Sequence, residues 1–129
     1  MAIAFLIGRI IFGGYFLLNA YKHFVNNSGL VGWVGSMGVK SPKLAVVGSG
    51  ALLLIGGLSV VLGYMPVIGV IALALFLIPV SFRVHAYWKA TDPQMKMNEK
   101  IAFQKNMALL GAAIILLGIA EPWAYSLQF

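Results

Sequence analysis

Charged residues are scarce in this sequence, and acidic residues are almost absent. Only 9% of the 129 residues are Asp, Glu, Lys or Arg, and three of them are acidic. A soluble domain has roughly a quarter of its residues in these four types, because they cover its surface with groups that water solvates. With 61% hydrophobic residues and a mean hydropathy of +0.95, most of this chain is expected to face lipid. The composition excludes soluble enzymes, disordered proteins and nucleic-acid-binding modules.

Cysteine is missing altogether. Its absence excludes disulfides, thiolate metal sites, iron-sulfur clusters and a CxxC redox relay. The net charge of +6 is interpreted as a signal for membrane orientation, because the cations are spread along an apolar chain. Nucleic acid is therefore not an expected partner, and no covalently bound cofactor is expected.

The apolar runs predict the architecture. A helix needs roughly 20 residues to cross the hydrocarbon layer, so four crossings need about 80 residues and fit this length, whereas six do not. The uncharged stretch from Leu44 to Phe82 would be about 58 Å long as one helix, which indicates two crossings joined at 63–66. We predict one all-α domain over 1–129: an integral membrane four-helix bundle, with helices near 2–21, 44–63, 66–86 and 101–120.

The segment 26–42 lies between the first two predicted helices. It is too short and too rich in glycine to cross the membrane, yet it carries apolar residues and Trp33. We expect it to lie in the membrane interface with Trp33 at headgroup level; a plain exposed loop is the alternative.

Lysine and arginine are distributed unevenly between the two ends of the predicted bundle. Of the nine, only Arg9 lies near the end that holds both termini, and the others lie in or beside the two long loops. The positive-inside rule then predicts both long loops in the cytoplasm and both termini outside.

Small residues at helical spacing predict where helices approach one another in lipid, because they let backbones come close. The candidates for helix packing are Gly13, Ala45, Ser49, Gly56, Ser59, Gly63, Ala108 and Ala112.

Polar residues within the apolar runs are the candidate functional groups. A cation in hydrocarbon costs on the order of 2.5 to 3.5 kcal/mol, so Arg9 should face the bundle or snorkel to the outer surface. Arg9 either belongs to a packing stripe or binds an anion, a quinone carbonyl or a lipid headgroup. His23 and His85 both fall at cytoplasmic helix ends, where a pair of histidines could ligate haem or a metal, or contact a quinone. Structural hydrogen bonding is the preferred interpretation of both histidines, and haem is disfavoured.

The order of several short motifs resembles the DoxX family of small four-helix membrane proteins, across roughly residues 5–118. The residues that carry the resemblance are Arg9, Gly13, Phe16 and Lys22, then the turn 37–42 (MGVKSP), Gly56-Gly57-Leu58, Leu62-Gly63, His85-Ala86-Tyr87-Trp88, Asp92-Pro93, Phe103-x-Lys105-Asn106 and Leu109-Leu110-Gly111.

The resemblance implies a membrane protein of bacteria or archaea, linked to redox complexes through relatives that include a subunit of a thiosulfate:quinone oxidoreductase. Many relatives carry a glutamate where this chain has Leu53, so a buried acid for proton transfer is missing here. This departure favours an accessory or stabilising subunit without catalytic activity of its own, bound to membrane lipids and to other subunits or further copies of itself.

Two other functions stay open beside the accessory role. A quinone-linked oxidoreductase subunit would place Arg9, His85, Trp88 and Lys105 around the quinone headgroup, with the redox cofactor supplied by a partner chain. A transporter of small molecules or lipids is the third, and the scarcity of polar residues inside the membrane gives it little support.

Overall fold

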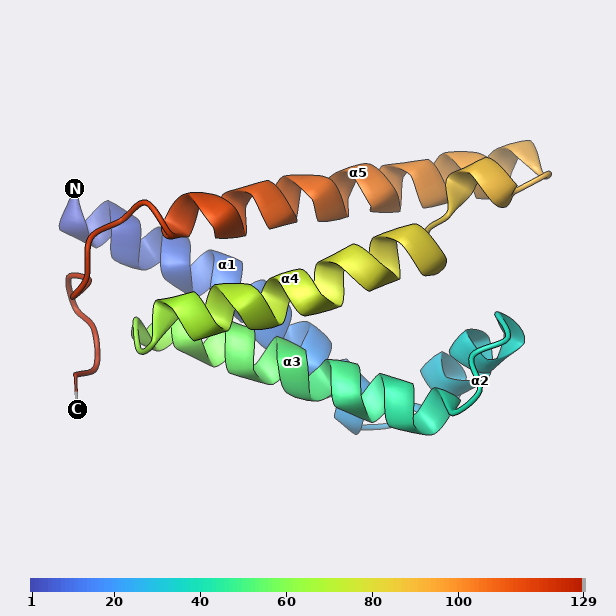
Figure 1. Cartoon of the computed structure of the whole chain (residues 1–129), viewed down its shortest axis with the longest axis horizontal. Helices are drawn as coiled ribbons and strands as arrows, with labels where there is room; N and C mark the ends of the chain where they lie inside the picture. Colours follow the sequence, from blue (N-terminus) through green and yellow to red (C-terminus); the bar gives the residue numbers. More distant parts are fainter. Residues whose placement is uncertain (129) are drawn as a thin grey trace.

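A computed structural model describes residues 1–128, and over this range the chain is all helical, as predicted (Figure 1). The elements are α1 (Ala2–Phe24), α2 (Ser28–Ser36), α3 (Pro42–Leu62), α4 (Pro66–Arg83), the short 3-10 helix η1 (Tyr87–Lys89) and α5 (Pro93–Leu116).

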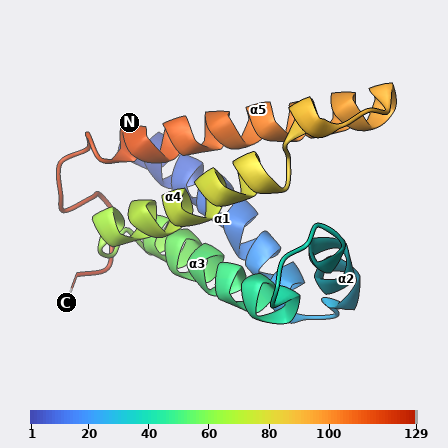
Figure 2. The ribbon, with the colours of Figure 1, turned by 45° about the vertical axis from the view of Figure 1, so that its right-hand side comes forward.

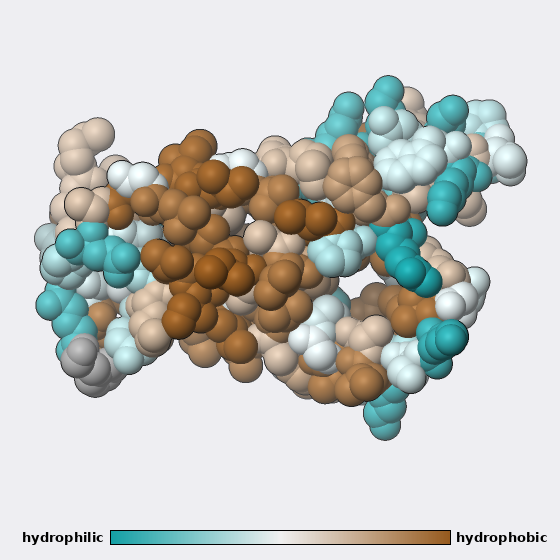
Figure 3. All heavy atoms as spheres, viewed as in Figure 1, coloured by the Kyte–Doolittle hydropathy of each residue, from teal (hydrophilic) through white to brown (hydrophobic). Residues whose placement is uncertain are grey.

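The four long helices alternate in direction, so both termini lie at one end of the molecule, whereas α2 and the connection through η1 lie at the other (Figures 1 and 2). Helix α3 packs against α1 and α4, α5 packs against α4, and α2 packs against α3. The buried core between them is apolar and includes Phe16, Leu53, Val60, Leu73, Leu77 and Ala113. Apolar side chains cover the middle of the molecule and hydrophilic ones gather at its two ends (Figure 3), which is the distribution of a membrane protein.

Proline and glycine set the helix boundaries. Pro42, Pro66 and Pro93 each open a helix, where the missing N–H costs nothing. Gly63 ends α3 in the left-handed conformation with φ of 67°. The Asp92 carboxylate caps α5 by accepting a 2.9 Å hydrogen bond from the backbone N–H of Met95.

The boundaries of the last two predicted helices need correction. Helix α4 ends at Arg83 and not at 86, and the chain then turns through η1. Helix α5 covers 93–116 and not 101–120, because the Asp92-Pro93 start signal lies well before the apolar run. Three helical segments are long and apolar enough to cross a membrane, namely Ala2–Phe24, Pro42–Leu62 and Pro66–Lys89. Helix α5 is not among these three segments, because its first half is charged.

The other predicted elements also differ in extent. Helix α1 continues to Phe24 instead of ending at 21, and α3 begins two residues earlier than the predicted 44–63 and ends at Leu62. The segment 26–42 contains a helix, α2, which has no buried residue and lies against the start of α3. Part of the segment is therefore helical, and its placement in the membrane interface stays a prediction.

Close helix crossings occur at several of the predicted small residues. A Cβ on Gly13 would lie 2.5 Å from Val61 Cγ2 and 2.8 Å from the Gly57 carbonyl oxygen, so α1 and α3 touch there. A Cβ on Gly56 would meet Leu73 of α4. Ser59 donates hydrogen bonds of 2.7 and 3.0 Å to the carbonyls of Tyr64 and Met65 at the α3–α4 turn.

The remaining candidates for helix packing have other surroundings. Ala45 is exposed on α3 and Ser49 is half-buried there; both line the cavity described below. Gly63 acts as a helix cap. On α5 the buried small residue is Ala113, whereas Ala108 is exposed and Ala112 half-buried, so the predicted Ala108-x-x-x-Ala112 pair is one position out of register with the core.

Candidate functional site

A cavity of about 1070 Å³ lies at the end of the bundle that holds α2. Its walls come from α1, α2, the 38–41 connection, α3, α4 and the residues just after α4, and α5 contributes Lys105 and Asn106. At this end Figure 3 shows a hollow between α5 and α2, with hydrophilic residues along its edge.

The inner wall of the cavity is apolar. It includes the fully buried Phe16, Leu53 and Leu77. Leu44 of α3 and Leu75 of α4 also line it, although they are 73% and 57% exposed on the outer face of the bundle. The cavity is therefore continuous with the surface that faces lipid.

Four cations line the same cavity: Lys22, Lys40, Arg83 and Lys105. No acidic side chain is among the lining residues, and within residues 1–128 none of these four cations makes an ion pair. Lys105 lies over the ring of Tyr15, with Nζ 5.6 Å from the ring centre. The cavity thus combines an apolar wall with an unbalanced positive charge.

His85 enters the cavity beside Trp33, with ring centres 6.2 Å apart. Its Nδ1 lies 2.7 Å from Oε2 of Glu99 on α5, and both side chains are mostly buried. The carboxylate of Glu99 therefore interacts with His85. This contact ties the segment after α4 to α5.

Two further polar side chains of the cavity wall come from α1. Asn19 donates through Nδ2 to the carbonyl of Tyr15 (2.8 Å), and His23 Nδ1 donates to the carbonyl of Asn19 (2.7 Å). The His23 ring packs edge-on against Phe76 of α4, with ring centres 5.9 Å apart. Both side chains bond to their own helix and have capacity left for a ligand.

Asn106 on α5 is the most buried polar residue that lines the cavity, with an exposed fraction of 5%. No hydrogen bond within residues 1–128 reaches its amide, whose N and O atoms are instead accessible to the cavity. Because these atoms stay accessible, a molecule bound in the cavity can supply their hydrogen-bond partner. Asn106 was not among the predicted site residues, although an amide in the apolar run after 101 was the available signal.

Two of the predicted contact residues, Trp88 and Arg9, lie away from this cavity. Trp88 packs in an aromatic cluster with Phe82, Tyr87 and Phe103, with ring centres 5.2 to 6.1 Å apart. Because α4 ends at Arg83, Trp88 does not share a helical face with His85. Of the four side chains expected around one headgroup, the structure therefore brings together His85 and Lys105.

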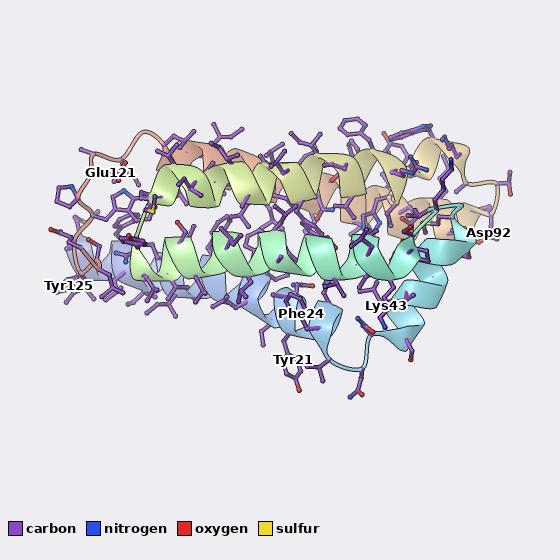
Figure 4. All side chains as sticks on the ribbon, turned by 60° about the horizontal axis from the view of Figure 1, so that its bottom comes forward. Tyr21, Phe24, Lys43, Asp92, Glu121 and Tyr125 are labelled. Carbon is purple, nitrogen blue, oxygen red and sulfur yellow. The ribbon has the colours of Figure 1, made fainter. Side chains whose placement is uncertain are left out.

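Arg9 belongs to the opposite end of the bundle, because its Nη2 donates a 3.1 Å hydrogen bond to the carbonyl of Tyr125. Figure 4 shows Tyr125 and Glu121 at that end, with Lys43 and Asp92 at the other. The exposed fraction of Arg9 is 2%, and its guanidinium lies 5.3 and 5.4 Å from the ring centres of Phe5 and Trp123. It donates hydrogen bonds to four backbone carbonyls, so its side chain is satisfied by the protein itself.

Both histidines proposed for haem or metal line the one cavity, and each already uses Nδ1 in a hydrogen bond. Over the part of the chain that the structure describes, no group of three His, Cys, Asp or Glu side chains is arranged to hold a metal ion. The arrangement fits the binding of a molecule with an apolar body and a polar head better than it fits metal coordination.

The DoxX family model matches residues 4–86, which is more than half of the chain. The chain belongs to the DoxX family. The match covers α1 to α4 and ends just after His85, so the earlier marks of the resemblance fall inside it and those on α5 fall outside. A comparison with curated proteins finds no match, and no solved structure matches either.

Proposed function

We propose that this DoxX-family membrane protein is an accessory subunit of a larger membrane redox or energy-converting complex and holds an amphiphilic molecule, a quinone or a lipid, in the cavity beside α2. The observation that carries the proposal is the cavity itself. Its volume suits a ligand larger than a metabolite, its apolar wall opens toward lipid, and polar and charged groups line the same space.

The lining residues favour binding over catalysis. General acid–base chemistry needs a group that can exchange a proton beside the substrate. The cavity wall carries no carboxylate, so His23 and His85 are its candidates for such a group, and each of them already uses Nδ1 in a hydrogen bond. Leu53, at the position where many relatives carry a glutamate, is fully buried in the apolar wall.

The first test is whether an amphiphile co-purifies with the protein. Gly48 lines the cavity, and a Cβ added to it would have no atom within 4 Å, so Gly48→Phe adds bulk at the cavity wall without a clash at Cβ. Gly111 on α5 is equally open but lies outside the cavity, which makes Gly111→Phe the matched control. After purification in mild detergent, lipid and quinone extracted from each variant are quantified by mass spectrometry.

Depletion of one class of bound amphiphile in Gly48→Phe, and not in Gly111→Phe, supports the proposal. Equal amounts in both variants would show that the molecules come from the outer belt of lipid, and the cavity would lose its assigned role. An absorption spectrum of the same samples checks for haem through its Soret band.

A quinone-linked oxidoreductase subunit is the second candidate, favoured by the His85–Glu99 pair beside Trp33. A histidine held by a carboxylate can donate to a quinone carbonyl and return the proton. Native purification separates the two functions. An accessory subunit should migrate with a larger complex whose turnover survives His85→Ala, whereas in an oxidoreductase this substitution should abolish quinone reduction.

A further inference from the structure

We infer that the cavity ligand is an anionic glycerophospholipid, with its phosphate beside Lys40 and Arg83 at the cavity mouth. This inference rests on the proposed binding function and names the class of ligand. Its first ground is charge: Lys22, Lys40, Arg83 and Lys105 line one cavity without an acidic neighbour in its wall. These four residues are exposed, and like charges that line one cavity repel one another, so a bound anion reduces the repulsion.

The position of the cations in the fold matches the depth of a lipid phosphate. Arg83 ends α4 and Lys40 precedes α3, so both lie where the chain leaves the apolar part of the bundle. Trp33 lines the cavity at the same end, and tryptophan prefers the headgroup level of a membrane. A phosphate bound among these residues would stay at the depth that lipid phosphates have in the bilayer.

The apolar part of the cavity gives a route for acyl chains. Leu44 and Leu75 face both the cavity and the outer surface, so chains can leave sideways into the membrane. A free phosphate ion has no apolar part to contact this wall, whereas a neutral quinone carries no charge to pair with the cations. A phospholipid with a net negative charge satisfies both parts.

Asn106 supplies the second, independent observation. It is seven residues beyond Glu99 along α5, about 10 Å deeper in the bundle by helix rise. Its buried amide has no partner within residues 1–128 and is accessible to the cavity. In a glycerophospholipid the ester carbonyls lie on the chain side of the phosphate, so the Asn106 amide can donate to an ester carbonyl while the cations hold the phosphate.

Native mass spectrometry of the full chain in neutral detergent tests the inference. The protein is mixed with dioleoylphosphatidylglycerol and dioleoylphosphatidylcholine, which share acyl chains and differ in net charge. We expect the anionic lipid to be preferred by roughly tenfold, since each cation near an anionic headgroup adds a several-fold gain in affinity. In K40Q/R83Q this preference should fall to nearly one.

The matched control is K89Q/K96Q, which removes the same charge from exposed positions outside the cavity. If both double variants lose the preference equally, a diffuse surface charge attracts the lipid and the site is refuted. Asn106→Leu should weaken binding of both lipids by about fivefold without changing the preference for the anionic one. Unchanged binding in this variant would overturn the role of Asn106.

Two further arms separate the inference from the proposed function. Inorganic phosphate at millimolar concentration should not displace the lipid; displacement would show a site for the free ion. A short-chain quinone that binds wild type but not Gly48→Phe, with no preference for the anionic lipid, would overturn the inference and leave the proposed function intact. If no amphiphile binds at all, both fail.

Discussion

Arg9 on α1 donates a 3.1 Å hydrogen bond from Nε to the carbonyl of Val60 on α3. Its Nη2 reaches the carbonyl of Val61 at 2.9 Å. Both carbonyls are in the last turn of α3, where no intrahelical donor exists and where the helix dipole is negative. The same guanidinium also binds the carbonyls of Ala124 and Tyr125, so one buried cation joins α1, the end of α3 and the C-terminal segment.

The first prediction concerns this cation. Arg9→Met keeps much of the side-chain volume but leaves four carbonyls without their donor. We expect the free energy of unfolding to fall by about 3 kcal/mol, because unsatisfied buried acceptors cost about 1 to 3 kcal/mol and the four bonds are not additive. Unfolding in detergent, followed by circular dichroism, measures this change.

Arg83→Met is the control, because Arg83 is exposed and makes no ion pair in the described part of the chain. It should unfold within about 0.5 kcal/mol of wild type. Limited proteolysis gives a second readout, since the segment after α5 should be cleaved faster in Arg9→Met alone. Similar stability of the two variants would show that Arg9 does not hold this end of the bundle.

A second prediction concerns Gly63, which ends α3 beside Arg9. Its φ of 67° disfavours any side chain, and a Cβ there would lie 2.8 Å from Arg9 Nη2 and 2.6 Å from Ser126 Cβ. Gly38 has a similar φ of 82° but open space around it. Gly38→Ala should therefore report only the conformational cost, about 1 kcal/mol, and Gly63→Ala should cost roughly 2 kcal/mol more because of the clash. Equal losses of stability would mean that the guanidinium and Ser126 move away freely.

The sequence alone predicts the all-α fold and three of the long apolar helices closely, because runs without charge leave few alternatives in lipid. It fails on α5, where Asp92-Pro93 starts the helix in a charged stretch that a search for apolar runs passes over. The site is less predictable. His85 and Lys105 do meet at one cavity, but the partners of Arg9 lie more than 50 residues away along the chain, and no local pattern reveals that α3 ends beside it.

A third prediction tests the α1–α3 crossing. Gly13→Ala would place a Cβ 2.5 Å from Val61 Cγ2 and 2.8 Å from the Gly57 carbonyl oxygen, so the helices must separate, at a cost of about 1 to 3 kcal/mol. The next residue is the control, because Gly14 has no atom within 4 Å of a Cβ. Gly14→Ala should be neutral or slightly stabilising, since alanine favours the helix. If both substitutions were neutral, the two helices would be less closely packed than the structure indicates.

A fourth prediction concerns the pair formed by His85 and Glu99, which are 2.7 Å apart and 18% and 23% exposed. A double-mutant cycle with His85→Ala and Glu99→Gln should give a coupling energy of about 0.5 to 1 kcal/mol, the usual range for a pair that water still reaches. High salt should lower this coupling only slightly, because the pair is partly buried. Zero coupling would show that the two side chains do not interact in the membrane.

The last prediction concerns the number of crossings, for which the lack of cysteine offers a clean experiment. Single cysteines at Asn27, Thr91 and Gln128 can be labelled one at a time with a maleimide that does not cross sealed vesicles. Helices α3 and α4 run antiparallel, and α5 returns to the end that holds both termini (Figure 1). The first two positions should therefore be labelled from the same side of the membrane, and the third only from the opposite side. The reason that α5 should cross, despite the lysines in its first half, is that Leu109, Leu110 and Leu116 pack against the core shared with α1 and α4. Labelling of all three positions from the same side would place α5 along the membrane surface and reduce the number of crossings to three.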